Sequence, residues 1–139
     1  MRAFSVAPEK KAKILSIIEG ILEKEPFVLF AFVHGSFLET SLFRDIDVAV
    51  YTQKLEPSSI SKLESKLSNA IEQSIPRRIP VEVKVINEAP LPFRFNVIRG
   101  KLLVSKDDLL LDEFIVGTAR HYLDFQPLRH RYIKEAITS

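Results

Sequence analysis

Cysteine is absent from this chain of 139 residues, and glycine occurs only four times. Without cysteine the chain can form neither a disulfide nor a thiolate metal site, so any metal ion must be bound through oxygen or imidazole ligands. The same absence favours a reducing compartment. Because glycines are so few, each is expected to have a backbone role, and Gly35 is the one that directly follows a predicted strand.

Long hydrophobic runs and a signal sequence are also absent. No run approaches the roughly eighteen apolar residues that span a bilayer, and residues 1–13 contain no apolar core of signal-peptide length. We therefore expect a soluble, cytoplasmic protein without a membrane partner. The 20 basic and 18 acidic residues are interleaved, so no DNA partner is expected although the pI is near 8.9.

The hydrophobic pattern of the first half predicts a helix followed by two strands. Residues 8–24 carry apolar side chains at the spacing of an amphipathic helix. Residues 27–33 are a continuous apolar run, which is typical of a strand buried on both faces. Residues 45–51 alternate with a period of two, which indicates a strand with one covered and one open face.

The second half is predicted to alternate helix and strand. A helix begins near residues 57–59, where a serine can cap the free amides, and it ends before Pro76. After it we predict a strand at 81–86, a turn-rich connection at 87–92, a short strand at 101–104, and helical structure from 107 with a break or kink at Pro127.

This order of elements predicts an α+β or mixed α/β fold, with helices packed on a small sheet. A chain of 139 residues, 46% of them hydrophobic, can bury a sizeable core. We expect residues 1–139 to form a single domain, with a core at about 8–106 and a C-terminal helical segment at 107–139.

Two carboxylates lie close together at the start of the second predicted strand. Side chains alternate along a strand, so Asp45 and Asp47 point to the same face while Ile46 and Val48 point to the core. Neighbouring carboxylates repel each other unless a cation lies between them, and Mg²⁺ accepts carboxylate oxygens together with water and phosphates. The alternative is that both are solvated charges on an exposed face.

A third carboxylate, Glu82, alternates with valines in the predicted strand at 81–86, so it also points away from the core. If that strand lies beside the strand of Asp45 and Asp47, the three carboxylates converge. Such a set can hold two cations about 3.5–4 Å apart, an arrangement that serves phosphoryl and nucleotidyl transfer. The alternative for Glu82 is an exposed side chain paired with Lys84.

Between the first two strands, the dipeptide Gly35-Ser36 offers a bare backbone and a hydroxyl that can contact phosphate oxygens. A simple turn is the alternative. Arg44 is a candidate phosphate contact, with an ordinary surface arginine as the alternative. His34 is expected to make a local hydrogen bond rather than to take part in catalysis.

With these motifs the chain resembles the nucleotidyltransferase superfamily, and more closely the minimal nucleotidyltransferases that act as antitoxins beside HEPN-domain partners. The matching stretches are residues 32–37, 44–50, 80–90, 93–103 and 122–128. The resemblance implies a small mixed sheet with flanking helices, and transfer of AMP from ATP to a hydroxyl of a partner protein in the presence of Mg²⁺. It also implies that the reaction silences a HEPN ribonuclease toxin.

Carried over by position, the resemblance assigns Gly35 and Ser36 to the triphosphate. Asp45 and Asp47 would hold the metal ions, and Glu82 would take the place of the third carboxylate and help to deprotonate the acceptor. That third position is usually an aspartate in the family, so a module that neutralises its partner by contact alone is an alternative. A small-molecule nucleotidyltransferase is a further alternative, although little chain is left for a substrate domain.

A core of this size has too little wall to enclose both ATP and an acceptor. We therefore expect a hetero-complex in which a HEPN-domain partner completes the site, and a second copy of the chain is a further candidate partner. Aromatic and arginine side chains of the C-terminal segment are candidates for the partner-binding face, with a solvated helix end as the alternative; they are Arg120, Tyr122, Phe125, Arg129, Arg131 and Tyr132.

Overall fold

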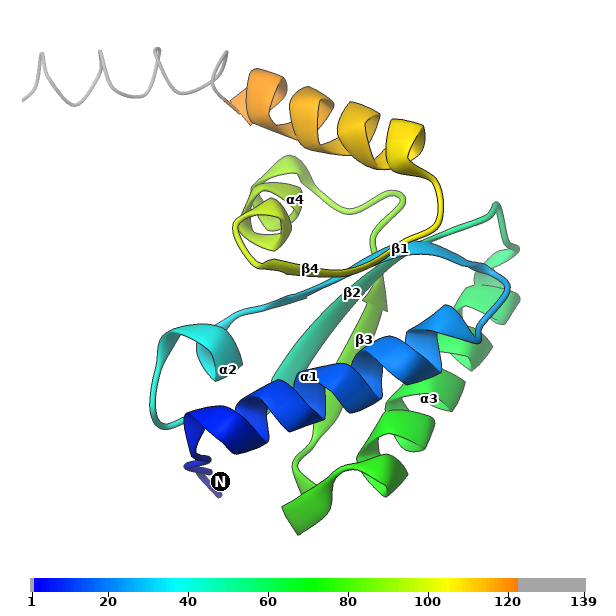
Figure 1. Ribbon diagram of the computed structural model, residues 1–139. Coiled ribbons are helices and arrows are strands. Elements are labelled where there is room, and N and C mark those ends of the chain that lie inside the picture. Colours follow the sequence, from blue (N-terminus) through cyan, green and yellow to red (C-terminus); the bar gives the residue numbers. More distant parts are fainter. Residues whose placement is uncertain (1, 123–139) are drawn as a thin grey trace, which may run out of the picture.

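A computed structural model of the chain describes residues 2–122 (Figure 1). The elements in chain order are α1 (Pro8–Glu23), β1 (Val28–His34), α2 (Ser36–Glu39), β2 (Ile46–Thr52), α3 (Pro57–Ser74), the 3₁₀ helix η1 (Pro76–Arg78), β3 (Val81–Val85), α4 (Leu91–Ile98), β4 (Lys101–Ser105) and a helix at 108–122. This order confirms the predicted mixed α/β fold. The predicted segment beyond residue 122, with its kink at Pro127, lies outside the described residues.

The four strands form one mixed sheet in the order β3-β2-β1-β4. The central strand β1 pairs antiparallel with both β2 and β4, whereas β2 and β3 are parallel and are joined through α3. As predicted from its apolar run, β1 is buried on both faces. The small mixed sheet expected from the resemblance is therefore present.

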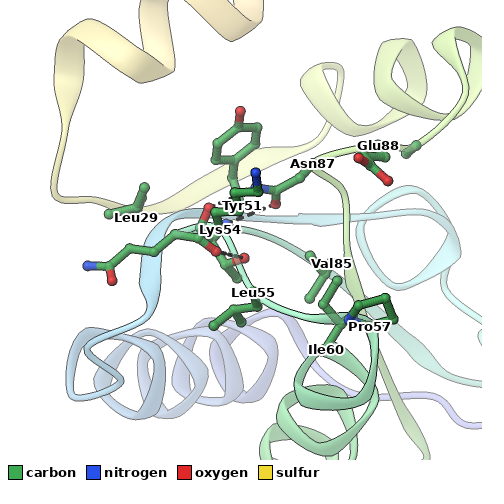
Figure 2. A pocket seen from close by; sticks show the side chains of 12 residues that line it. Leu29, Tyr51, Lys54, Leu55, Pro57, Ile60, Val85, Asn87 and Glu88 are labelled. Carbon is green, nitrogen blue, oxygen red and sulfur yellow. Dashed lines mark hydrogen bonds between the residues drawn. The ribbon is translucent and has the colours of Figure 1, made fainter.

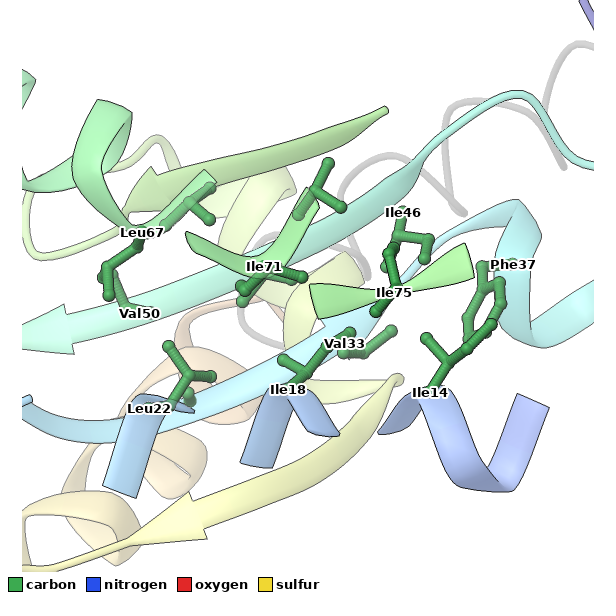
Figure 3. Packing of buried hydrophobic residues seen from close by; sticks show 14 of the residues in the cluster. Ile14, Ile18, Leu22, Val33, Phe37, Ile46, Val50, Leu67, Ile71 and Ile75 are labelled. Atoms are coloured by element: carbon green, nitrogen blue, oxygen red, sulfur yellow. The ribbon is translucent and has the colours of Figure 1, made fainter. Parts of the chain in front are cut away.

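Helices cover both faces of this sheet. In Figure 1, α1 and α3 lie on one side, and α4 lies on the other with the yellow to orange helix 108–122. Figure 3 shows the packing on the first side, where Ile18, Leu22 and Ile71 of the two helices lie over Val33 and Val50 of the strands. A smaller apolar cluster on the second side consists of Phe30, Phe32, Ala49, Ile86, Val97, Leu111 and Phe114.

Three local predictions were wrong. The strand at β2 is not open on one face, because α4 and the 108–122 helix bury Ala49. The connection predicted at 87–92 gives way to a helix that begins at Leu91, since Pro92 lies in the first turn, where no backbone N–H donor is needed. Glu56, not a serine, occupies the N-cap of α3 and makes no side-chain cap hydrogen bond.

The outer edge of β3 is held by side chains from α3. The backbone amides of Val81, Val83 and Val85 donate to Glu72 Oε1, Ser68 Oγ and Glu64 Oε2 at 2.8, 3.2 and 2.9 Å. The three acceptors are four residues apart, so they lie on one face of the helix. These bonds satisfy an edge that would otherwise be exposed, and they hold the strand that carries Glu82 in place.

Across residues 2–122, the helices are all too short or too polar to span a bilayer.

Candidate active site

The predicted carboxylates meet where β1 ends and where β2 and β3 begin. In the sheet register, His34 of β1 lies opposite Asp47 of β2, and Asp47 lies beside Glu82 of β3. Side chains at register positions share a face, so these three form a row across three strands. Asp45, two residues before Asp47, points to the same side.

Ligand oxygens of Asp45, Asp47 and Glu82 all lie within 4.8 Å of one another. The convergence predicted from strand alternation is therefore present. Asp45 and Asp47 are half-buried, whereas the side chain of Glu82 is 55% exposed and also lies 3.7 Å from the Nζ of Lys84. The pairing with Lys84 thus coexists with the convergence, and an exposed pair of this kind is weak enough to open.

The electrostatics of this cluster show that it is under repulsion. Burial, and then the charges of Asp45 and Glu82, raise the pKa of Asp47 to about 6. Two carboxylates beside a half-buried one disfavour its ionised form, and a cation among them removes that penalty. Three oxygen donors at this spacing, with one open side, fit a hard divalent cation such as Mg²⁺.

Among the histidines that the structure describes, His34 lies next to the cluster. Its ring packs edge to face on Phe93 of α4, with 5.4 Å between the ring centroids. Within residues 2–122 the ring makes this contact and not the local hydrogen bond that we predicted. Burial lowers the pKa of His34, although the nearby charges of Glu82 and Asp45 act in the opposite direction. His34 therefore favours the neutral form and contributes an apolar wall beside Asp47.

In the turn after β1, the backbone of Gly35 lies directly against the carboxylate cluster. Gly35 has φ 87° and ψ −159°, a conformation that is rare outside glycine, and a Cβ at this position would lie 2.7 Å from Oδ2 of Asp47. Ser36 follows at the start of α2. The loop is clamped from α1 by Lys11, whose Nζ donates to the carbonyls of Phe37 and Thr40 at 2.6 and 2.9 Å.

A hollow of about 300 Å³ opens beside this turn, lined by His34, Gly35, Glu39, Asn96 and Arg99. We did not predict Asn96 and Arg99, because α4 was not predicted. The sequence offered one signal for the close packing of α4 on β1, namely Gly100, which follows the helix. A Cβ on Gly100 would lie 2.3 Å from the carbonyl oxygen of Val33, so only glycine lets the end of α4 approach β1 so closely.

Arg44 lines a different hollow, of about 230 Å³, which Asp45 also lines. A larger hollow, of about 780 Å³, lies at the far ends of β2 and β3 (Figure 2) and contains none of the predicted site residues. There the side-chain amide of Asn87 is already used, since it accepts from the Thr52 amide at 3.0 Å and donates to its carbonyl at 2.7 Å. The candidate chemistry is therefore at the opposite end of these strands.

Part of the predicted partner-binding face falls within the described residues. Tyr122 stacks on Phe95 of α4, with 3.7 Å between ring centroids and 5° between the planes. Arg120 is exposed, and the residues of this face from Phe125 onward lie outside the described part of the chain.

Solved structures with the same fold cover nearly the whole chain. A complex of tri-AMPylated Shewanella oneidensis HEPN toxin with MNT antitoxin matches at 21% identity and a TM-score of 0.57, over 93% of this chain and 97% of that chain. A toxin–antitoxin structure with AMP-PNP matches at 22% identity and a TM-score of 0.60, over 95% and 99%. At this level of identity the likeness shows the fold.

A comparison with curated proteins finds no match. The family model described as polymerase beta, nucleotidyltransferase matches residues 16–109. This match covers more than half of the chain and includes the Gly35-Ser36 turn and all three carboxylates. The chain therefore belongs to the polymerase beta nucleotidyltransferase family.

Proposed function

We propose that this chain transfers AMP from ATP to a hydroxyl of a partner protein, and that the partner is a HEPN-domain ribonuclease toxin which the transfer silences. The observation that carries the proposal is the convergence of three carboxylates beside the Gly35-Ser36 turn. Family membership supports nucleotidyl transfer in general. The relative solved with a tri-AMPylated HEPN toxin supports this particular acceptor.

In this proposal Asp45, Asp47 and Glu82 hold Mg²⁺, which when bound neutralises charge on the phosphates and on the leaving pyrophosphate. Glu82 is exposed on the open side of the cluster, so it is placed to meet an incoming acceptor. There it accepts the proton of the attacking hydroxyl. A bond forms between the acceptor oxygen and the α-phosphorus of ATP, the α–β phosphoanhydride bond breaks, and pyrophosphate leaves.

The phosphates of the nucleotide are assigned to the Gly35-Ser36 turn and to the hollow beside it. The backbone at Gly35 has no side chain to obstruct a phosphate, and Ser36 offers a hydroxyl. Arg99 brings a guanidinium to the same hollow, and its Cζ is held 5.9 Å from the centre of the Phe95 ring. Arg44, which lines the same hollow as Asp45, stays a predicted phosphate contact.

Intact-mass spectrometry of a HEPN-domain partner, co-expressed from the neighbouring gene, tests this function. We expect a mass gain of one or more AMP groups after incubation with the chain, ATP and Mg²⁺. The double variant Asp45→Asn/Asp47→Asn should give no gain, because the metal ligands are lost while the size of the side chains is kept. Asp112→Asn/Glu113→Gln, on the exposed side of the 108–122 helix, is the matched control and should act like the wild type.

A stable complex with no mass gain would contradict this function and favour neutralisation by contact alone. The ion pair between Glu82 and Lys84 supports that alternative, because it gives the third carboxylate a partner within the chain. AMP transfer to a small molecule in the absence of the partner would instead support the third alternative, a small-molecule nucleotidyltransferase.

A further inference from the structure

Three arginines line the hollow of about 230 Å³ that Asp45 also lines. The lining residues are Arg2, Phe4, Arg44, Asp45, Arg78 and Pro80. Among the lining residues, the guanidinium groups of Arg2 and Arg78 outnumber the carboxylate of Asp45, and like charges held around one small space attract an anionic ligand. Arg44 also interacts within the chain, so Arg2 and Arg78 are the two arginines assigned to the ligand.

The first side of this hollow is built by the segment before α1. Phe4 exchanges two backbone hydrogen bonds with Phe43, at 2.7 and 3.0 Å, and the two rings stack with 6.1 Å between centroids. Both phenylalanines are 2% exposed. Because Phe43 precedes Arg44 and Asp45, this bridge places the N-terminal segment next to the carboxylate cluster, with the Arg2 guanidinium 5.6 Å from the Phe4 ring centre.

The second side is the turn between α3 and β3. Arg77 and Arg78 both have positive φ, at 68° and 52°, a conformation that is uncommon for residues other than glycine. Arg77 holds the turn to the N-terminal segment, because its Nη1 donates to the Ser5 carbonyl at 2.7 Å and its Cζ lies 5.8 Å from the Phe4 ring centre. Residues other than glycine with positive φ cluster at active sites and ligand-binding sites, where the surrounding structure holds them in place.

We propose that this arginine-lined hollow binds acidic side chains of the acceptor protein, close to the hydroxyl that receives AMP. The proposal rests on the proposed function, and it adds the chemistry by which the acceptor is recognised. Arginine pairs with carboxylates in a planar, two-bonded geometry that suits an acidic peptide segment. An acceptor held here lies beside Asp45, in a hollow that shares no lining residue with the hollow assigned to the nucleotide.

Protein fits this hollow better than nucleic acid. Binding of single strands usually combines cations with aromatic rings on which bases stack, and the rings nearest this hollow, Phe4 and Phe43, are buried. The hollow, of about 230 Å³, is also small, and the basic and acidic residues of the chain are interleaved rather than gathered into a stripe. The geometry therefore suits one or two carboxylates rather than a phosphate backbone.

Charge reversal tests the proposal through binding, independently of AMP transfer. The affinity of the HEPN-domain partner would be measured by isothermal titration calorimetry for wild type and for Arg2→Glu/Arg78→Glu, with AMP-PNP affinity measured in parallel. We expect partner binding to weaken about tenfold or more and to lose part of its salt dependence. AMP-PNP binding should not change. Lys10→Glu/Lys13→Glu, on the exposed face of α1, introduces the same charge change and should bind like the wild type.

A competition experiment with peptides tests whether the hollow binds carboxylates. An octaglutamate peptide should displace the partner from the wild type, and an octaglutamine peptide should not. Unchanged partner affinity in the double variant would overturn the proposal. So would a loss of AMP-PNP binding, which indicates a nucleotide phosphate site, or a loss of binding to a single-stranded RNA decamer, which indicates a nucleic acid acceptor. Thermal unfolding of each variant shows whether the fold is retained.

The two proposals can fail separately. If the partner gains no AMP but its binding still depends on Arg2 and Arg78, the transfer is wrong and the docking site stands. If AMP transfer proceeds in the double variant with an unchanged KM for the partner, the docking site is wrong and the transfer stands. Where both hold, the double variant should show a KM for the partner about tenfold higher, with kcat within about twofold of the wild type.

Discussion

The two faces of the sheet are built from the same strands but carry different roles. The face under α1 and α3 is mainly apolar, and Ile46, Val48 and Val50 of β2 are fully buried there. The opposite face is apolar only under α4 and the 108–122 helix, and towards the start of β2 it changes to Asp47. Because alternate side chains of a strand face opposite ways, one face can stabilise the fold while the other carries charges.

The carboxylates on the charged face repel one another, which lowers the stability of the fold in the absence of a cation. The pKa of Asp47 is raised to about 6, which means that the folded chain without a cation disfavours three ionised carboxylates at neutral pH. Substitutions on the first face should therefore reduce stability, whereas removal of charge on the second should increase stability and abolish the chemistry. Four predictions test this contrast, from the largest expected effect to the smallest.

The largest effect is expected on the apolar face. Ile71 of α3 is fully buried between the helix and the sheet, so Ile71→Ala should lower the free energy of unfolding by about 3 kcal/mol through lost contacts and a cavity. Urea denaturation measures this change. Leu109→Ala, at a side chain that is 71% exposed, is the control and should change stability by less than about 0.5 kcal/mol. Equal effects at the two positions would contradict the assignment of the core.

The next effect is expected where the backbone meets the cluster. Gly35→Ala puts a methyl group at 2.7 Å from Asp47 Oδ2 and forces a non-glycine residue to φ 87°, so we expect a loss of about 2 kcal/mol in stability, together with reduced AMP transfer. Gly20→Ala is a matched control within α1, where the new methyl group would meet nothing within 4 Å. That control should be neutral or stabilise the helix by up to about 1 kcal/mol.

Mg²⁺ should bind to the charged face and stabilise the fold. At a free concentration of ten times its Kd, a cation that binds only the folded chain adds about 1.4 kcal/mol to the free energy of unfolding. Differential scanning fluorimetry across a Mg²⁺ titration would show this as a rising Tm. The same titration of Asp45→Asn/Asp47→Asn should leave the Tm unchanged, and an equal rise in that variant would place the cation elsewhere.

The smallest effect concerns pH in the absence of metal. The folded-state pKa of Asp47 lies above its ordinary value of 3.8, so the folded chain binds the proton more tightly than the unfolded chain. Stability should therefore fall as pH rises from about 4 to about 6 and then level off. Asp47→Asn removes this fall, and in EDTA at pH 7 it should stabilise the chain by on the order of 1 kcal/mol, after allowance for the exposure of the group. Thermal unfolding from pH 4 to 8 tests it, and identical profiles for the two chains would contradict the raised pKa.

The convergence of the carboxylates could be predicted from the sequence on the condition that β3 lies beside β2, because the rest depends on local rules. Alternation places Asp45 and Asp47 on one face, and the helix that follows can join parallel neighbouring strands, which brings Glu82 beside Asp47. The hollow with Asn96 and Arg99 could not be predicted in the same way. Its helix, α4, begins with a proline in its first turn and buries only Val97, so no amphipathic stripe marks it.

By itself, the sequence determined the order of the main elements, the apolar stripes that cover one face of the sheet, and the identity of the three carboxylates. These depend on periodicity and on residue type, which are local properties. Only the tertiary structure decided which residues gather near the carboxylates: His34 and Arg99 line one hollow, and Arg2 and Arg78 line another. Those neighbours come from distant parts of the chain, and their positions depend on how helices and turns pack onto the sheet, which no local pattern specifies.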